Sequence, residues 1–157
     1  AHNKELPRFA GWWNHNKETR FNMRQPFDVM EGAEGWQLSN PPILSMAAIR
    51  ASLDMFNKVG MEALREKSEK LTGYFEFLIN QLETNRIKII TPSNPKERGC
   101  QLSIQVQNAD KILHKKLTEN NIITDWREPD VIRCAPVPMY NSFEDVFRMV
   151  GILKNLL

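Results

Sequence analysis

One short segment in which apolar and polar residues alternate strictly constrains the fold more than any other feature. The segment is CQLSIQV, residues 100–106, and its apolar positions are Cys100, Leu102, Ile104 and Val106. Successive side chains of a β-strand point to opposite faces, so the apolar side chains share one face and the polar ones share the other. We therefore expect a half-buried strand in a sheet that is covered on one side.

Strands and helices alternate around this segment from residue 61 to the C-terminus. The expected helices cover residues 61–83, 109–120 and a final stretch that starts at Ser142, and the other expected strands cover 87–90, 122–126 and 131–135. Ser142 followed three residues later by Asp145 is a capping signature. The expected buried stripe of this last helix is Phe143, Val146, Phe147, Val150 and Leu153. The pattern predicts an α/β sandwich with helices on one face of a small sheet.

The helix expected over residues 61–83 carries apolar residues at alternating spacings of three and four. They are Met61, Leu64, Leu71, Phe75, Leu78 and Leu82, with Ser68 in the same stripe. Such a stripe fits either the seam of a coiled coil or a long helix that lies across its own domain. Three heptads interrupted by a serine are weak evidence for a coiled coil, so we favour the second interpretation.

The N-terminal part of the chain has a different character. Residues 1–41 show little periodicity and contain three of the four tryptophans, which suggests a surface loop that packs against something else. From Pro42 to about Asn57 the pattern becomes helical, with apolar residues on most sides, so we expect a well-buried helix. Asn40 stands at a plausible N-cap of this helix, with Pro41 at its first position.

Composition and charge exclude several classes of protein. The 157 residues are 41% hydrophobic and 25% charged, which is ordinary for a globular protein. A formal net charge of +2 without a run of five basic residues argues against nucleic acid or an anionic membrane as the main partner. No apolar stretch is long enough for a membrane helix, and the first residues lack the apolar core of a signal peptide.

The cysteines give no sign of a disulfide or a metal site. Cys100 and Cys134 lie in apolar, strand-like runs without metal-ligand spacing around them. We interpret both as reduced core residues, which suits a cytoplasmic protein. Neither has a histidine near it in sequence, so a Cys-His catalytic pair is not expected.

Arg133 and Asn40 are the strongest candidate binding residues, and each has two interpretations. Arg133 lies in VIRCAPVP, where alternation places it on the face opposite Ile132 and Cys134. It is either a solvated arginine or a bidentate ligand of a carboxylate or phosphate. Asn40 is either a helix cap alone or part of an anion site at the helix N-terminus.

The segment GWWNH, residues 11–15, offers indole N–H donors and the imidazole of His15 in one loop. The alternative is that one tryptophan packs in a core and His15 is merely exposed. The sequence contains no GxGxxG, P-loop, HExxH, CxxC or GxSxG motif. From the residues alone, the sequence indicates an α/β domain with an anion-binding arginine.

Five segments together make the chain resemble the C-terminal part of the kynureninase family. They are RFAGWWNHNKETRFNM, EGAEGWQLSNPPIL, LTGY, ITPSNPKERGCQLSI and IRCAPVPMYNSFEDV, and they run in order from about Leu6 to the C-terminus. The resemblance implies a pyridoxal-phosphate-dependent hydrolase of fold type I, the aspartate aminotransferase-like fold. This family cleaves kynurenine or 3-hydroxykynurenine into an anthranilate and L-alanine, in tryptophan catabolism and NAD biosynthesis.

The resemblance also implies roles for individual residues. Trp12 and Asn40 are expected to contact the pyridoxal phosphate. Arg133 is expected to bind the substrate α-carboxylate, with Ser39 close to the substrate ring and His15 in the same site. Asn14 stands where the family pattern has glycine before His15, which affects the expected backbone of that loop.

The resemblance further implies that this chain holds a part of the enzyme. The family's Schiff-base lysine is expected upstream of these residues, so we expect no catalytic residue here and no activity from the chain alone. Residues 1–58 would be the tail of the large cofactor domain, and residues 59–157 the small C-terminal domain. A cytoplasmic homodimer with its site at the subunit interface is expected. The alternatives are a freestanding module that binds an anion or amino acid and a dimerisation piece that uses the 61–83 helix.

Overall fold

The computed structural model describes residues 5–22 and 26–157. The chain forms two compact units, an N-terminal unit, Ala1–Met55, and a C-terminal unit, Phe56–Leu157. Each unit is described by itself below.

The C-terminal unit is built on a four-stranded antiparallel sheet. Its strands are β1 (Ile87–Ile89), β2 (Leu102–Val106), β3 (Asp125–Arg127) and β4 (Val131–Cys134), in the spatial order β1-β2-β4-β3. Leu102, Ile104 and Val106 of β2 are buried, and the residues between them are partly exposed. The alternation read from the sequence is therefore confirmed for the strand itself.

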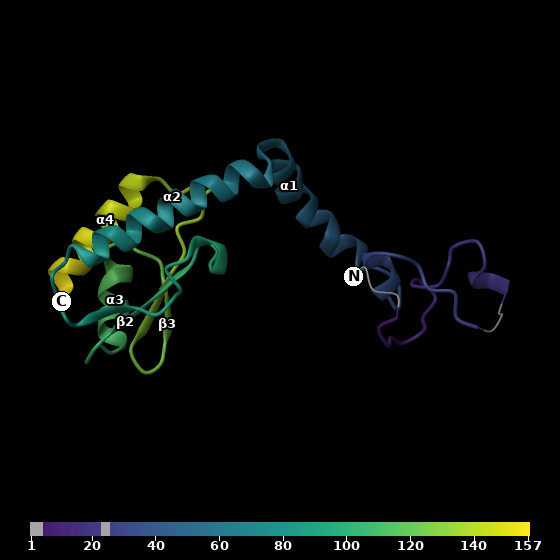
Figure 1. Cartoon of the computed structure of the whole chain (residues 1–157), viewed down its shortest axis with the longest axis horizontal. Helices are drawn as coiled ribbons and strands as arrows, with labels where there is room; N and C mark the ends of the chain where they lie inside the picture. Colours follow the sequence, from purple (N-terminus) through teal and green to yellow (C-terminus); the bar gives the residue numbers. More distant parts are fainter. Residues whose placement is uncertain (1–4, 23–25) are drawn as a thin grey trace. The chain divides into compact units, whose positions relative to one another are not determined.

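Three helices cover one face of this sheet, as Figure 1 shows. They are α2 (Met61–Asn80), α3 (Lys111–Glu119) and α4 (Phe143–Leu156). Their apolar stripes meet the buried side chains of β2 and β4 in one core, which includes Leu71, Phe75, Leu117, Ile132 and Leu153. This arrangement confirms the predicted α/β sandwich with helices on one face of a small sheet.

The start of α4 is fixed by the predicted capping box. The backbone N–H of Asp145 donates to Ser142 Oγ at 3.1 Å, and the backbone N–H of Ser142 donates to Asp145 Oδ2 at 2.7 Å. The bond from the Ser142 backbone is the largest cause that lowers the pKa of Asp145 below its ordinary value. The expected stripe is wrong at two positions, because Phe143 and Phe147 are exposed and Met149 is buried instead. The buried face of α4 follows the spacing Val146, Met149, Val150 and Leu153.

Helix α2 lies across its own unit, as favoured from the sequence. Leu64, Ser68, Leu71 and Phe75 are buried, and α2 packs against α4. The helix ends at Asn80 rather than residue 83, and Met61 at its first turn is exposed. Most of the stripe is already covered by the unit's own core, so it is not available as a coiled-coil seam.

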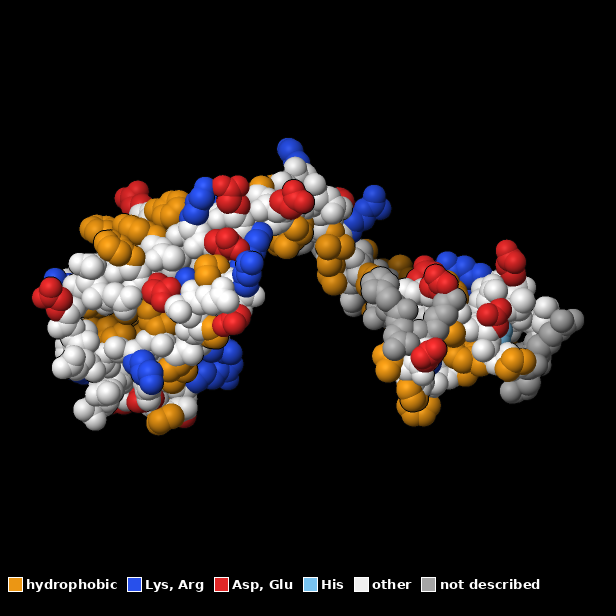
Figure 2. Space-filling model, in the orientation of Figure 1, with side chains coloured by type: hydrophobic (Ala, Val, Ile, Leu, Met, Phe, Trp, Pro, Cys, Tyr) orange, Lys and Arg blue, Asp and Glu red, His pale blue; other side chains and the backbone are white. Residues whose placement is uncertain are grey.

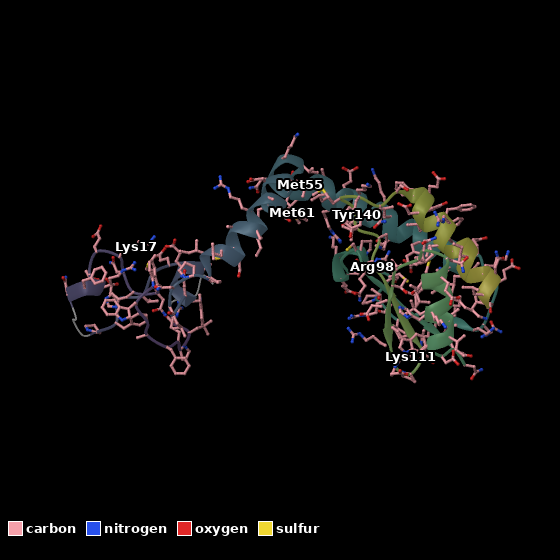
Figure 3. The ribbon with its side chains drawn as sticks, turned by 180° about the vertical axis from the view of Figure 1, so that it is seen from behind. Lys17, Met55, Met61, Arg98, Lys111 and Tyr140 are labelled. Carbon is pink, nitrogen blue, oxygen red and sulfur yellow. The ribbon has the colours of Figure 1, made fainter. Side chains whose placement is uncertain are left out.

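Two arginines tie the segment between β1 and β2 to α2. The Arg98 side chain, labelled in Figure 3, is 2% exposed and donates to Glu76 Oε2 at 2.6 Å and to the Pro92 carbonyl at 3.3 Å. Arg65 donates to the Arg98 carbonyl at 2.9 Å. Cys100 follows in the same segment, outside β2 and only partly buried, so its expected place in the core is wrong.

The N-terminal unit has little regular structure apart from its last helix. It contains two short 3₁₀ turns, η1 (Arg20–Asn22) and η2 (Ala33–Trp36), and the start of helix α1 (Ile43–Val59). The prediction that this helix is well buried is wrong for this chain, because none of its residues, all of which the structure describes, is buried. Figure 2 shows hydrophobic side chains along it at the surface. Its apolar residues include Ile43, Leu44, Ile49 and Leu53, and nothing in the described part of the N-terminal unit covers them.

Two phenylalanines of the C-terminal unit provide a matched test of this core. Phe75 is 2% exposed and Phe147 is 60% exposed. We expect Phe75→Ala to lower the free energy of unfolding by about 3–5 kcal/mol, because it leaves a cavity under the helix layer. Phe147→Ala should change it by less than about 1 kcal/mol. Urea denaturation followed by circular dichroism measures both, and Phe75→Leu replaces Phe75→Ala if that variant does not fold. Equal effects at the two positions would contradict this core.

Candidate functional site

Arg133 lies on the face of the sheet opposite the helices. It sits on β4 directly between Ser103 of β2 and Asp125 of β3 in the strand register. Its neighbours Ile132 and Cys134 are buried on the other face. The predicted orientation of Arg133 is thus confirmed.

Arg133 forms part of a three-residue charge cluster on this face. Its Nε donates to Asp125 Oδ2 at 2.8 Å, and its Nη2 donates to the same oxygen. Arg127, two residues along β3, places its Nη2 3.0 Å from that oxygen. The bond from Arg133 is the largest cause that holds the pKa of Asp125 below its ordinary value, and the charge of Arg127 adds to it. Arg133 is therefore half-buried and paired with a carboxylate, rather than freely solvated.

A cavity of about 380 Å³ lies on the other side of the C-terminal unit. It is bordered by α4 and by the segments before β3 and after β4, and its lining includes Thr124, Cys134, Asn141, Asp145 and Arg148. Arg133 does not line it. Burial raises the pKa of the Cys134 thiol to about 12, so the thiol stays protonated at neutral pH and is a poor nucleophile. The cavity thus holds no activated cysteine.

The GWWNH loop of the N-terminal unit is built around Asn14. Its side chain is fully buried, accepts from the Gly11 backbone N–H at 2.7 Å and donates to the Phe9 carbonyl at 2.8 Å. Asn14 does not have a positive φ, so this position does not require the glycine of the family pattern. Asn14 closes the loop with its own side chain.

The same loop packs directly against the segment that leads into SNPP. A Cβ atom at Gly11 would lie 2.3 Å from the Leu38 carbonyl oxygen, so only glycine allows this approach. The indole N–H of Trp13 then donates to Asn40 Oδ1. The structure thus brings together two motifs that are separated by more than twenty residues in the sequence.

Asn40 does not cap helix α1, contrary to the prediction. The helix starts at Ile43, and the Pro42 carbonyl accepts the first helical bond, from Met46 N at 2.9 Å. Asn40 therefore lies before the cap position, and its side-chain oxygen accepts from Trp13 instead. The backbone carbonyl of Ser39 accepts from Gln37 Nε2 at 3.0 Å, and the Ser39 residue is exposed.

Trp12 and His15 point into different surroundings. Trp12 is 51% exposed, and its ring centroid lies 5.4 Å from that of Phe21. His15 is partly buried, forms a β-bridge with Val29, and has its ring 5.5 Å from Phe27. None of the three tryptophans in this unit is buried, so the alternative of a core tryptophan is not supported.

The sequence reasoning did not assign four residues the contacts that the structure gives them. Asp125 and Arg127 alternate with Trp126, and a hairpin register between β3 and β4 would have placed them beside Arg133. Trp13 and Asn14 carried no comparable signal, because their contacts depend on the fold of an irregular loop. Within the described residues, no three of the His, Cys, Asp and Glu side chains are placed to hold a metal ion. No helix among them is long and apolar enough to span a membrane.

The role of Asn14 in the loop can be tested by hydrogen exchange. We expect Asn14→Ala to raise the exchange rate of the amides in residues 9–16 about tenfold or more, because the Gly11 N–H and the Phe9 carbonyl lose the buried side chain that bonds to both. Asn16→Ala is the matched control, since Asn16 bonds to Asp28 at an exposed position. Unchanged protection in Asn14→Ala would show that the loop is held by other contacts.

The two cysteines of this chain should differ in reactivity. Cys134 is buried with its pKa raised to about 12, whereas Cys100 is partly exposed. We expect a disulfide reagent at neutral pH to modify Cys100 first and Cys134 only after denaturation. Mass spectrometry of the labelled chain measures the order, and Cys100→Ser should remove the fast phase. Rapid labelling of Cys134 in the folded chain would contradict its burial.

Three comparisons with known proteins bear on these sites. Residues 64–153 match the family model described as the kynureninase C-terminal domain. The kynureninase of Myxococcus xanthus is 54% identical over 154 residues, 98% of this chain and 36% of that protein. The kynureninase of Koribacter versatilis is 53% identical over 96% of this chain and 35% of that protein. This chain therefore spans about a third of the length of these relatives.

Solved structures show the same fold at low sequence identity. The apo structure of a cysteine desulfurase from Thermococcus onnurineus has a TM-score of 0.67 at 16% identity, over 96% of this chain and 38% of that one. A C-DES mutant with glycine covalently linked to its PLP cofactor has a TM-score of 0.65 at 18% identity, over 95% of this chain and 38% of that one. On the evidence of the family model, which covers more than half of its residues, this chain belongs to the kynureninase C-terminal domain family.

Proposed function

We propose that the full-length protein that contains this chain is a kynureninase. It hydrolyses the Cβ–Cγ bond of L-kynurenine or 3-hydroxykynurenine and releases an anthranilate and L-alanine. The observation that carries this proposal is the identity of 50–54% to proteins named kynureninase over nearly the whole chain. The matched region includes the segments that contain Trp12, Asn40 and Arg133, since the matches cover at least 95% of this chain.

Arg133 binds the α-carboxylate of the substrate in this proposal. Guanidinium matches a carboxylate with two parallel N–H donors, which fixes both the position and the plane of the bound group. Its place on the open face of the sheet leaves it 34% exposed and within reach of a ligand. By fixing the carboxylate, Arg133 sets the orientation of the bonds at Cα without taking part in their cleavage.

The donors of the N-terminal unit fit pyridoxal phosphate. Trp12 offers a half-exposed indole ring for stacking, and Asn40 offers an amide whose oxygen is held by Trp13 and whose Nδ2 can donate to an anionic oxygen. When bound, the cofactor would supply the electron sink for the negative charge that develops as the Cα–H and Cβ–Cγ bonds of the substrate break. In this proposal Trp12 and Asn40 would hold the cofactor, Ser39 would lie close to the substrate ring, and His15 would belong to the same site.

The division of the protein follows from the same proposal. Residues 1–58 are the tail of the large cofactor domain, and residues 59–157 are the small domain. The match of the C-terminal domain model to residues 64–153 supports the second range. The Schiff-base lysine is supplied by a part of the full-length protein outside these residues, so the chain alone does not turn over substrate.

We also propose that the enzyme is a cytoplasmic homodimer with its site at the subunit interface, acting in tryptophan catabolism and NAD biosynthesis. The uncovered apolar residues of α1 support burial against another part of the assembly, since exposed apolar area of this kind favours association. The two unpaired cysteines suit a reducing compartment.

The role of Arg133 is tested in the full-length enzyme. We expect Arg133→Ala to lower kcat/KM for kynurenine at least about 100-fold, or about 2.7 kcal/mol, because the substrate loses its carboxylate anchor. Lys88→Ala is the control, since Lys88 lies two strands away in the same sheet and should leave kcat/KM unchanged. An undiminished kcat/KM in Arg133→Ala would remove Arg133 from the site.

A further inference from the structure

The partners of Arg133 in the charge cluster point to a role that goes beyond ion pairing. We propose that Asp125 is a positioning residue that aims the guanidinium of Arg133 at the substrate carboxylate, and that Arg127 restores the positive charge that Asp125 cancels. This inference rests on the proposed function, because it takes the carboxylate of the substrate as the ligand of Arg133.

The pair with Asp125 uses only one of the two donor edges of the Arg133 guanidinium. A guanidinium has two donor edges, one formed by Nε and one Nη atom and the other formed by the two Nη atoms. Asp125 Oδ2 accepts from Nε at 2.8 Å and from Nη2, so it occupies the first edge. The second edge, with Nη1 and the outer N–H of Nη2, carries the parallel donors that a substrate carboxylate needs. Asp125 therefore fixes the plane of the group while it leaves this edge for the ligand.

The strand register restricts the direction in which the Arg133 side chain points. Asp125 and Arg133 are directly opposite each other in the antiparallel pair of β3 and β4, so their side chains leave the same face side by side. Ser103 lies on the other flank of Arg133, on β2. With neighbours on both sides, the long arginine side chain has fewer directions available to it than on an open surface.

The charge cluster keeps a net positive charge although Asp125 neutralises one arginine. Arg133 and Asp125 alone would be neutral, and an arriving carboxylate would feel no net attraction. Arg127 Nη2 lies 3.0 Å from Asp125 Oδ2, so the three side chains together carry one positive charge. The low pKa of Asp125 keeps its carboxylate ionised at neutral pH, so this balance holds there. Asp125 thus aims Arg133 without removing the attraction for an anion.

The test measures binding of L-alanine, the amino-acid product of the proposed reaction, to the full-length enzyme loaded with cofactor. The change in cofactor absorption on titration gives the dissociation constant for the wild type and for Asp125→Ala, Asp125→Asn, Asp125→Glu, Arg127→Gln and Arg133→Ala. Thermal melting verifies that each variant is folded. A role of Asp125 through charge alone and a role through aiming predict opposite signs, which makes the experiment decisive.

We expect Asp125→Ala to bind L-alanine about tenfold more weakly, although it removes a negative charge from the site. Asp125→Asn should bind about as well as the wild type, since an amide oxygen can accept at the same place. Asp125→Glu should be weaker by at least about threefold, because it keeps the charge but shifts the acceptor by one methylene. Arg127→Gln should bind about three- to tenfold more weakly at low salt, and this loss should shrink at high salt.

Two results would overturn the proposal, and they differ in what they imply. Equal or tighter binding by Asp125→Ala, together with weak binding by Arg133→Ala, would show that Asp125 acts only as a like charge and would leave the carboxylate site intact. Unchanged binding by Arg133→Ala would remove the carboxylate site itself and the positioning role with it. If Asp125→Ala does not fold, the order of the Asn and Glu variants decides, and tighter binding by Glu than by Asn contradicts aiming.

Discussion

The covering of the sheet on one side is the constraint on which the rest of the C-terminal unit depends. Leu102, Ile104 and Ile132 are completely buried under the helices, and the alternation of the strands then forces Ser103 and Arg133 onto the other face. A slip of one residue in β4 would bring the guanidinium into the core and expose Ile132. Burying an unpaired charge costs several kcal/mol, so the packing of the core also fixes the position of Arg133.

In the N-terminal unit, polar contacts rather than a sheet fix the positions of the candidate residues. One buried amide, that of Asn14, closes the loop, and the missing side chain of Gly11 lets the loop approach Leu38. Trp13 and Asn40 are thereby held together, and Trp12 remains half-exposed. A unit that relies on a few polar contacts and leaves the apolar side of α1 uncovered gains little from hydrophobic burial by itself.

The sequence predicted the parts of the fold that depend on periodicity and left out the parts that depend on tertiary contact. The alternation within β2, the stripe of α2 from Leu64 to Phe75 and the capping box at Ser142 are local signals, and each was confirmed. The prediction that α1 is buried was wrong, because its apolar residues are exposed in this chain. The predicted cap at Asn40 was wrong, because α1 begins at Ile43 and the Asn40 side-chain oxygen accepts from Trp13. The contact of Asp125 with Arg133 was not predicted, because it forms only when β3 pairs with β4. The strand pattern and the motif resemblance both made Arg133 a candidate binding residue, but neither could show what holds its side chain in place.

The pairing of Arg133 before any ligand arrives has an energetic consequence for binding. A free arginine side chain loses about 2 kcal/mol of conformational entropy when a ligand immobilises it. In this sheet Asp125 already restricts the Arg133 side chain, so most of its conformational entropy is lost on folding rather than on binding. A pair without a third charge would be poorly suited to bind an anion, because its members would neutralise each other. Arg127 resolves this conflict, and the alternation of Asp125 and Arg127 on one edge strand is the arrangement that places the restraint and the compensating charge on the same face.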